Sequence, residues 1–215
     1  MTKFVPVFPL ALVVFPGEML NLHIFEERYK QLIGEVIKQQ STFAIPSILN
    51  KEISEWATLV EVTELVKLYA DDKMDIRCKG VDVVRILEIV PEIPEKLYSG
   101  AIASKANFNS PYPIPGMLTV VELMRLLHQK LSITKNFDKP DAQLVSFDIA
   151  HHIGLSLEEE YRLLTMPLEN QRVIFLKKHL MQTLKVLNNV EELKKRVQLN
   201  GHFKDISSLG FNFSK

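Results

Sequence analysis

Apolar and polar residues alternate with a period of two over much of the first hundred residues, which predicts β-strands with one buried face. Two apolar segments, Phe4–Leu10 and Met19–Phe25, flank a turn at Phe15-Pro16-Gly17. Proline fixes its own φ and glycine accepts a positive φ, so this turn predicts a sharp reversal of the chain. Further strands are expected at 42–49, 56–69, 74–79, 81–90 and 98–105.

Breaks in this alternation predict local irregularities. Glu64 falls on the apolar face of its strand, and a β-bulge there would restore the pattern. Residues 71–73 predict a hairpin turn, residues 50–55 a polar loop, and Gly80 an interruption between two strands. The short, regular spacing of the strands favours a small, mostly antiparallel barrel or sandwich.

Helical periodicity predicts one helix inserted among the strands, over 27–39, and a second half that is helical throughout. Residues 107–116 (NFNSPYPIPG) mark the change and predict a linker. In the second half, the pattern predicts a helix over 145–153 closed by Gly154, and a capping box at Ser156 and Glu159. A leucine stripe from Val173 to about Leu199 predicts a long final helix.

The prediction is therefore an α+β protein in four segments. A mostly antiparallel β-barrel with one inserted helix is expected over 1–106, and a proline-rich linker over 107–117. A helical bundle ending in a long helix is expected over 118–205, followed by a loose tail over 206–215.

Composition and charge narrow the class of protein. The 215 residues are 47% hydrophobic, enough for a proper core, and the formal net charge is zero. A neutral chain lacks the basic footprint that binding to a phosphate backbone needs. The single cysteine, Cys78, is expected to be a buried structural thiol. Neither a signal peptide nor a membrane span is predicted, since the longest apolar run, Val5–Phe15, is short and holds two prolines, so a cytoplasmic protein is expected.

Motifs for catalysis are missing from the sequence. No two glycines have Walker A or dinucleotide spacing, no G-x-S-x-G places a nucleophile, and neither H-E-x-x-H nor C-x-x-C occurs. A metal site built from His151, His152 and residues 158–160 is an alternative, but the three acids are better explained as first-turn residues favoured by the helix dipole. We therefore predict a non-enzyme without catalytic residues, metal or cofactor.

A resemblance rests on three groups of residues at fixed spacing. They are Pro9-Leu10, then residues 14–17 (VFPG), then residues 20–29 (LNLHIFEERY). These residues resemble the N-terminal substrate-recognition domain of the ATP-dependent protease Lon, and weaker similarity extends over about residues 4–200. Two positions depart from the family pattern: Ala57 stands where Gly is usual, and Val83 where Arg is frequent.

The resemblance implies both a fold and a function. The fold would be a barrel of the pseudouridine-synthase-archaeosine-transglycosylase (PUA) type followed by a helical bundle. The function would be ATP-independent capture of unfolded or exposed apolar polypeptide, with an ATP-dependent protease as a candidate partner. The ATPase and peptidase modules of a full Lon protease are not found in this sequence.

Candidate binding residues follow from apolar groups at turns and strand ends, where polar residues are usual. They are Phe15, Pro16, Met19, Trp56 and Tyr69. The alternative for Phe15 and Met19 is that they plug the end of the barrel. A groove between the two halves is a further candidate surface.

Three alternatives stay open in the sequence. One is an RNA-binding PUA-like barrel, which rests on fold analogy alone and is disfavoured by the neutral charge. Another is a small hydrolase with an unrecognised site. The third is self-association through the leucine-striped helix.

Overall fold

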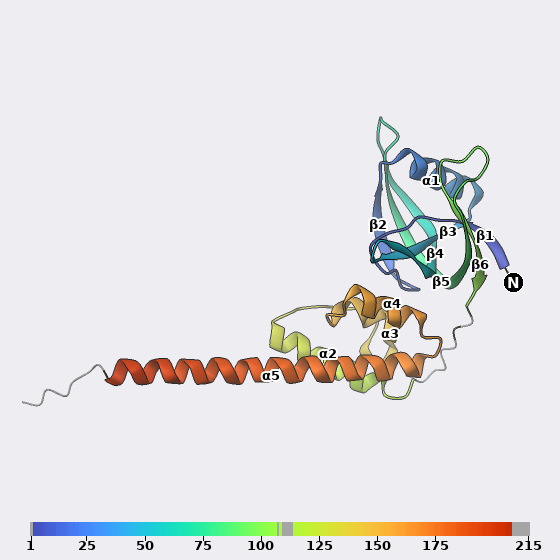
Figure 1. The fold of residues 1–215 in the computed structure, drawn as a ribbon. Helices are drawn as coiled ribbons and strands as arrows, with labels where there is room; N and C mark the ends of the chain where they lie inside the picture. The colour runs from blue at the N-terminus through green and yellow to red at the C-terminus, as the bar shows by residue number, and fades with distance from the viewer. Residues whose placement is uncertain (1, 107, 109–113, 208–215) are drawn as a thin grey trace, which may run out of the picture.

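The structure, a computed structural model, describes residues 2–106, 108 and 114–207 (Figure 1). All strands and helix α1 precede residue 106, and the helices of the second half begin at Met117. The predicted linker lies mostly outside the described residues, and so does the predicted tail from residue 208 onward.

Six strands form one antiparallel sheet in the order β1-β6-β5-β4-β3, with β2 also paired to β5. Their bounds are β1 Thr2–Pro6, β2 Met19–Ile24, β3 Thr42–Leu49, β4 Glu52–Leu68, β5 Met74–Val90 and β6 Gly100–Lys105. The long strand β5 pairs with β2 through its first part and with β6 through its last part. A short stretch around Gly80 therefore has β4 on one side and neither β2 nor β6 on the other.

The sheet is open, so the predicted closed barrel is wrong. Two isolated parallel bridges, Val7 to Ala44 and Leu10 to Ser47, join the segment after β1 to strand β3. They do not extend into a ladder between the two edges. Pro46 of β3 has no N–H group to donate, which removes one hydrogen bond along this seam.

The strand predictions need two further corrections. β5 is one continuous strand, whereas the sequence predicted a break at Gly80. The polar loop expected over 50–55 is instead a tight turn at Asn50 and Lys51, which both have positive φ and let β3 and β4 pair directly. The predicted bulge is confirmed, because the register between β4 and β5 shifts between Val62 and Glu64.

Helix α1 (Glu27–Gln39) covers one part of the sheet and confirms the predicted inserted helix. Its buried face packs into a core with strand residues such as Phe43 and Ile76. Cys78 belongs to the same core and is fully buried, and burial raises the pKa of its thiol to about 12. The thiol therefore stays protonated at neutral pH, as expected for a structural cysteine.

The second half consists of four α-helices (Figure 1). They are α2 Met117–Leu131, α3 Ser146–Ile149, α4 Leu157–Thr165 and α5 Glu169–Ser207. The single helix predicted over 145–153 is wrong: α3 is one turn long and passes into a 3₁₀ turn at Ala150–His152. The capping box at Ser156 and Glu159 is confirmed at the start of α4. Among the described helices, not one combines the length and hydropathy needed to cross a bilayer.

A shared core joins the helices to the sheet. It contains Val13, Phe15 and Val83 from the first half together with the buried faces of α2 and α5. Beside it, the Arg172 guanidinium donates hydrogen bonds to the Glu169 carboxylate and to the Ser146 hydroxyl, and the three residues are almost fully buried. This cluster fixes α3 to the start of α5.

Replacement of Gly80 by Ala tests how closely the chain packs at this strand. A Cβ atom at Gly80 would lie 2.3 Å from the carbonyl oxygen of Phe15, so one of the two backbones must move. We expect Gly80→Ala to lower the free energy of unfolding by roughly 1–3 kcal/mol in urea titrations. Gly34→Ala is the matched control, because no atom lies within 4 Å of its Cβ position and alanine favours a helix. An unchanged midpoint for Gly80→Ala would contradict the close approach.

The buried cluster gives a second stability prediction. Arg172→Met would leave the Glu169 carboxylate buried without its charged partner, and we expect a loss of about 3–5 kcal/mol in the free energy of unfolding. Arg196→Met is the control on the same helix, since the Arg196 side chain is 76% exposed. A loss below about 1 kcal/mol for Arg172→Met would show that the cluster does not hold α3 and α5 together.

Candidate functional site

The loop from Phe15 to Glu18 fills the gap beside Gly80 that neither β2 nor β6 occupies. Gly17 has a φ of 88° and donates its N–H to the Gly80 carbonyl at 2.8 Å, while the Gly80 N–H is bonded to the Glu18 carbonyl at 2.9 Å. The Glu18 carboxylate also accepts the Phe15 N–H at 2.8 Å. The loop is therefore fixed by hydrogen bonds at nearly every residue.

The Phe15 side chain lies beneath this loop and is completely buried. Its ring stacks on Phe147 with centroids 5.1 Å apart and contacts the His151 ring at 4.8 Å. Both partners come from the helical half. Phe15 thus fills the junction between sheet and helices, rather than the end of a barrel together with Met19, and is not available for direct contact with a ligand.

An outer hollow of about 620 Å³ opens over this junction. Leu12, Pro16 and Met19 line its sheet side, and Phe147 and Asp138 lie on its helical side. Leu12 is 37% exposed and Met19 is 50% exposed, so both offer apolar surface to solvent. The outer hollow is thus a groove between the two halves, with an apolar rim on the sheet side.

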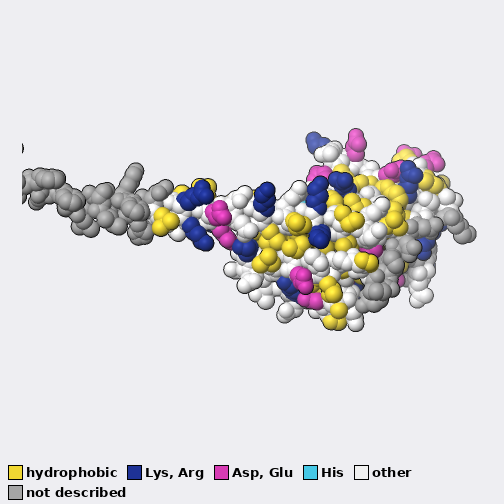
Figure 2. Space-filling view, turned by 90° about the horizontal axis from the view of Figure 1, so that it is seen from below, with side chains coloured by type: hydrophobic (Ala, Val, Ile, Leu, Met, Phe, Trp, Pro, Cys, Tyr) yellow, Lys and Arg dark blue, Asp and Glu magenta, His cyan; other side chains and the backbone are white. Residues whose placement is uncertain are grey.

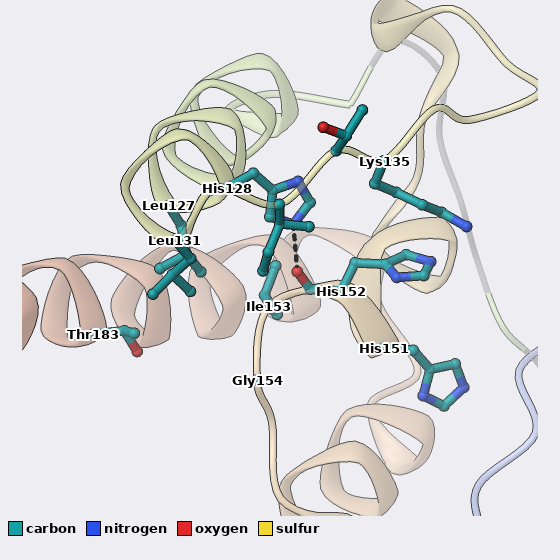
Figure 3. Close-up of a pocket in the computed structure, with 11 residues that line it drawn as sticks. Leu127, His128, Leu131, Lys135, His151, His152, Ile153, Gly154 and Thr183 are labelled. Carbon is teal, nitrogen blue, oxygen red and sulfur yellow. Dashed lines mark hydrogen bonds between the residues drawn. The ribbon is translucent and has the colours of Figure 1, made fainter.

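An inner hollow of about 370 Å³ lies next to the outer one, and His151, His152 and Lys135 line both (Figure 3). Its wall is mainly apolar and is formed by Leu127, Leu131, Ile133 and Ile153. Figure 3 shows the two leucines on α2, Thr183 on α5, and the two histidines on the segment that ends at Gly154. The two hollows together are called the groove below.

His151 connects the two sides of the groove. Its Nδ1 lies 2.7 Å from the Glu160 carboxylate and its Nε2 lies 3.1 Å from that of Glu18. Burial alone would lower the pKa of His151, but the hydrogen bonds and charges of Glu160 and Glu18 outweigh it and raise the pKa to about 10. At neutral pH the imidazolium therefore donates to a carboxylate on either side, and it ties the Phe15–Glu18 loop to α4.

His152 and His128 have different environments. Burial, together with the positive charges of Lys135 and His151, lowers the pKa of His152, so its ring is neutral. The buried His128 places Nε2 2.7 Å from the His152 carbonyl oxygen, so Nε2 carries the proton and donates. Its Nδ1 has no hydrogen-bond partner in the described part of the chain. This nitrogen is buried, so it is not exposed to the groove.

The five residues predicted for binding do not form one surface. Pro16 and Met19 line the outer hollow, and Phe15 lies buried below them. Trp56 is half-buried against the helical core, and its backbone N–H donates a hydrogen bond to the Tyr161 hydroxyl at 3.1 Å. Tyr69 lies at the hairpin between β4 and β5, with its hydroxyl bonded to Asp75 at 2.7 Å.

Comparison with known proteins identifies the family. A family model described as the ATP-dependent protease La (LON) substrate-binding domain matches residues 5–182. The chain belongs to this family. No curated protein matches the chain at a significant level.

Solved structures agree on the fold. A Lon N-terminal domain protein from Xanthomonas campestris aligns with a TM-score of 0.60 and 21% identity, covering 81% of this chain and 96% of that one. The N-terminal domain of Lon protease from the Mycobacterium avium complex aligns with a TM-score of 0.62 and 13% identity, covering 83% and 98%. At these identities the likeness concerns the fold alone.

Several groove residues of this LON substrate-binding domain were not expected from the sequence. Lys135, Asp138 and Phe147 line the groove, and the sequence pattern singled out none of the three for binding. His151 and His152 attracted attention only as a metal alternative, and the described residues hold no group of His, Cys, Asp and Glu suited to a metal ion. Their common location comes from the packing of the two halves, for which the sequence carries no local signal.

The charge of His151 predicts how stability depends on pH. Because folding raises the pKa of His151 to about 10, its contribution is complete below the unfolded pKa near 6.5 and is lost as pH rises toward 10. Urea titrations at several pH values should therefore show the wild type losing on the order of 1–3 kcal/mol more than His151→Gln over this range. Parallel pH profiles for the two proteins would show that His151 does not link the loop to α4.

Proposed function

We propose that this LON substrate-binding domain is a non-catalytic polypeptide-binding protein that captures unfolded or exposed apolar segments in the groove. The observation that carries the proposal is the groove itself, which has Pro16 and Met19 on one rim and an apolar inner wall. The family supports a substrate-recognition role. The protein would then either deliver the bound segment to an ATP-dependent protease or keep the segment away from that protease.

The shape of the groove suits an extended or partly unfolded segment. An unfolded chain presents isolated apolar side chains, and the exposed thioether of Met19 can adapt to several of them. A folded protein buries the same side chains. Capture therefore needs no chemistry, only apolar surface that is held open by the fixed Phe15–Glu18 loop.

RNA binding finds less support in the surface charge. On the face shown in Figure 2, lysine and arginine side chains are scattered among apolar and acidic ones rather than gathered into one basic patch. The formal net charge of the whole chain is zero. A single-stranded nucleic acid would need a positively charged groove along its backbone.

Met19→Asp tests the proposal. A labelled model protein, in its unfolded and folded forms, is titrated with this protein and followed by fluorescence anisotropy, with single-stranded RNA as a parallel ligand. We expect preference for the unfolded form and about fivefold weaker binding by Met19→Asp, because a charge replaces an apolar contact on the rim.

The control is Met181→Asp, since Met181 is 55% exposed on α5 and does not line the groove. Both variants should unfold at the wild-type urea concentration. Equal binding of folded and unfolded forms, equal loss in the two variants, or salt-sensitive RNA binding alone would each refute the proposal.

A further inference from the structure

The charged side chains of the groove differ in whether they pair with an opposite charge. Glu18 is bonded to His151, and Asp148 is paired with Lys139 at 2.6 Å. Lys135, by contrast, has no carboxylate within 4.0 Å in the described part of the chain, and its ammonium lies 5.6 Å from the Phe137 ring centre. Lys135 thus brings an uncompensated positive charge to the junction of the two hollows.

Lys135 is also held in place. The Arg125 guanidinium donates to the Lys135 carbonyl at 2.8 Å and pairs with Asp141 at 2.6 Å, which fixes the loop against α2. The flexible side chain extends from this fixed backbone toward His152 (Figure 3). Its proximity is reflected in the pKa of His152, which is lowered by burial first and then by the positive charge of Lys135.

From this arrangement we infer that the groove prefers polypeptide segments in which an apolar residue is followed or preceded by an aspartate or glutamate. This inference rests on the proposed function and names its substrate class. The apolar side chain would occupy the inner hollow beside Leu127, Leu131 and Ile153, and the side-chain carboxylate would pair with the Lys135 ammonium.

One further group of the groove limits the charge of the ligand. Asp138 lies on the outer hollow only, so a second negative charge on the segment would face it. The groove therefore favours a single acid beside an apolar residue and disfavours an acidic run.

The test uses three labelled peptides, amidated at the C-terminus, that share one leucine-rich sequence and differ at one position as Asp, Asn or Lys. In anisotropy titrations with the full chain, we expect the affinity to decrease in the order Asp, Asn, Lys peptide. The affinities of the Asp and Asn peptides should differ about three- to fivefold, which is typical of an exposed ion pair. High salt should reduce this preference. Amidation removes the C-terminal carboxylate, so the side-chain carboxylate of the Asp peptide is the one group that distinguishes it from the Asn peptide.

Charge reversal at one residue gives the sharper result. Lys135→Glu should reverse the order of the Asp and Lys peptides, Lys135→Gln should abolish the preference, and neither should alter binding of the Asn peptide. Lys178→Glu is the control, because Lys178 is an exposed residue of α5 outside the groove.

The outcomes separate this inference from the proposed function. Equal binding of the three peptides, or a preference that survives Lys135→Glu, would overturn the inference alone. Absence of binding for every peptide and for the unfolded model protein would overturn both.

Discussion

The close approach of the Phe15 backbone to Gly80 is the constraint on which the rest of the structure depends. At this point β5 changes partner from β2 to β6, and its free edge is paired by the Phe15–Glu18 loop instead. A glycine is needed because any side chain at position 80 would meet the Phe15 carbonyl. The same approach directs the Phe15 ring away from the sheet and into the helical core.

One aromatic residue thus joins two halves that are built by different rules. The sheet is stabilised by its ladder and by the core under α1, and the helices by their own apolar faces. Phe15 stacks on Phe147, which in turn lies 4.3 Å from the Arg172 guanidinium of the buried cluster. A chain of contacts therefore runs from Gly80 through two aromatic rings to the start of α5. The outer hollow of the groove meets this chain at Phe147, so one of its walls is held by the junction.

The sequence predicted what depends on local pattern and missed what depends on the meeting of distant segments. Helix α1, the bulge at Glu64 and the capping box at Ser156 each have a signal within a few residues, and each is confirmed. Closure of the sheet depends on two edges far apart in the chain, and only two isolated bridges form between them in the described residues. The turn at Asn50 and Lys51 was missed because neither residue is a glycine, although asparagine tolerates positive φ. Whether Phe15 is exposed could not be decided from an apolar turn, because its partner Phe147 is remote in sequence.

The electrostatics of the groove explain how a binding surface can be both preformed and adaptable. The His151 imidazolium connects Glu18 on the sheet side with Glu160 on the helical side, so the two sides are ordered before any ligand arrives. Preorganisation of this kind lowers the entropy lost on binding. The parts that remain free to adapt are the unbranched side chains of Met19 and Lys135, one apolar and one charged, on opposite sides of the opening. Fixed walls with flexible contacts at the rim suit ligands that share a chemical character but not a sequence.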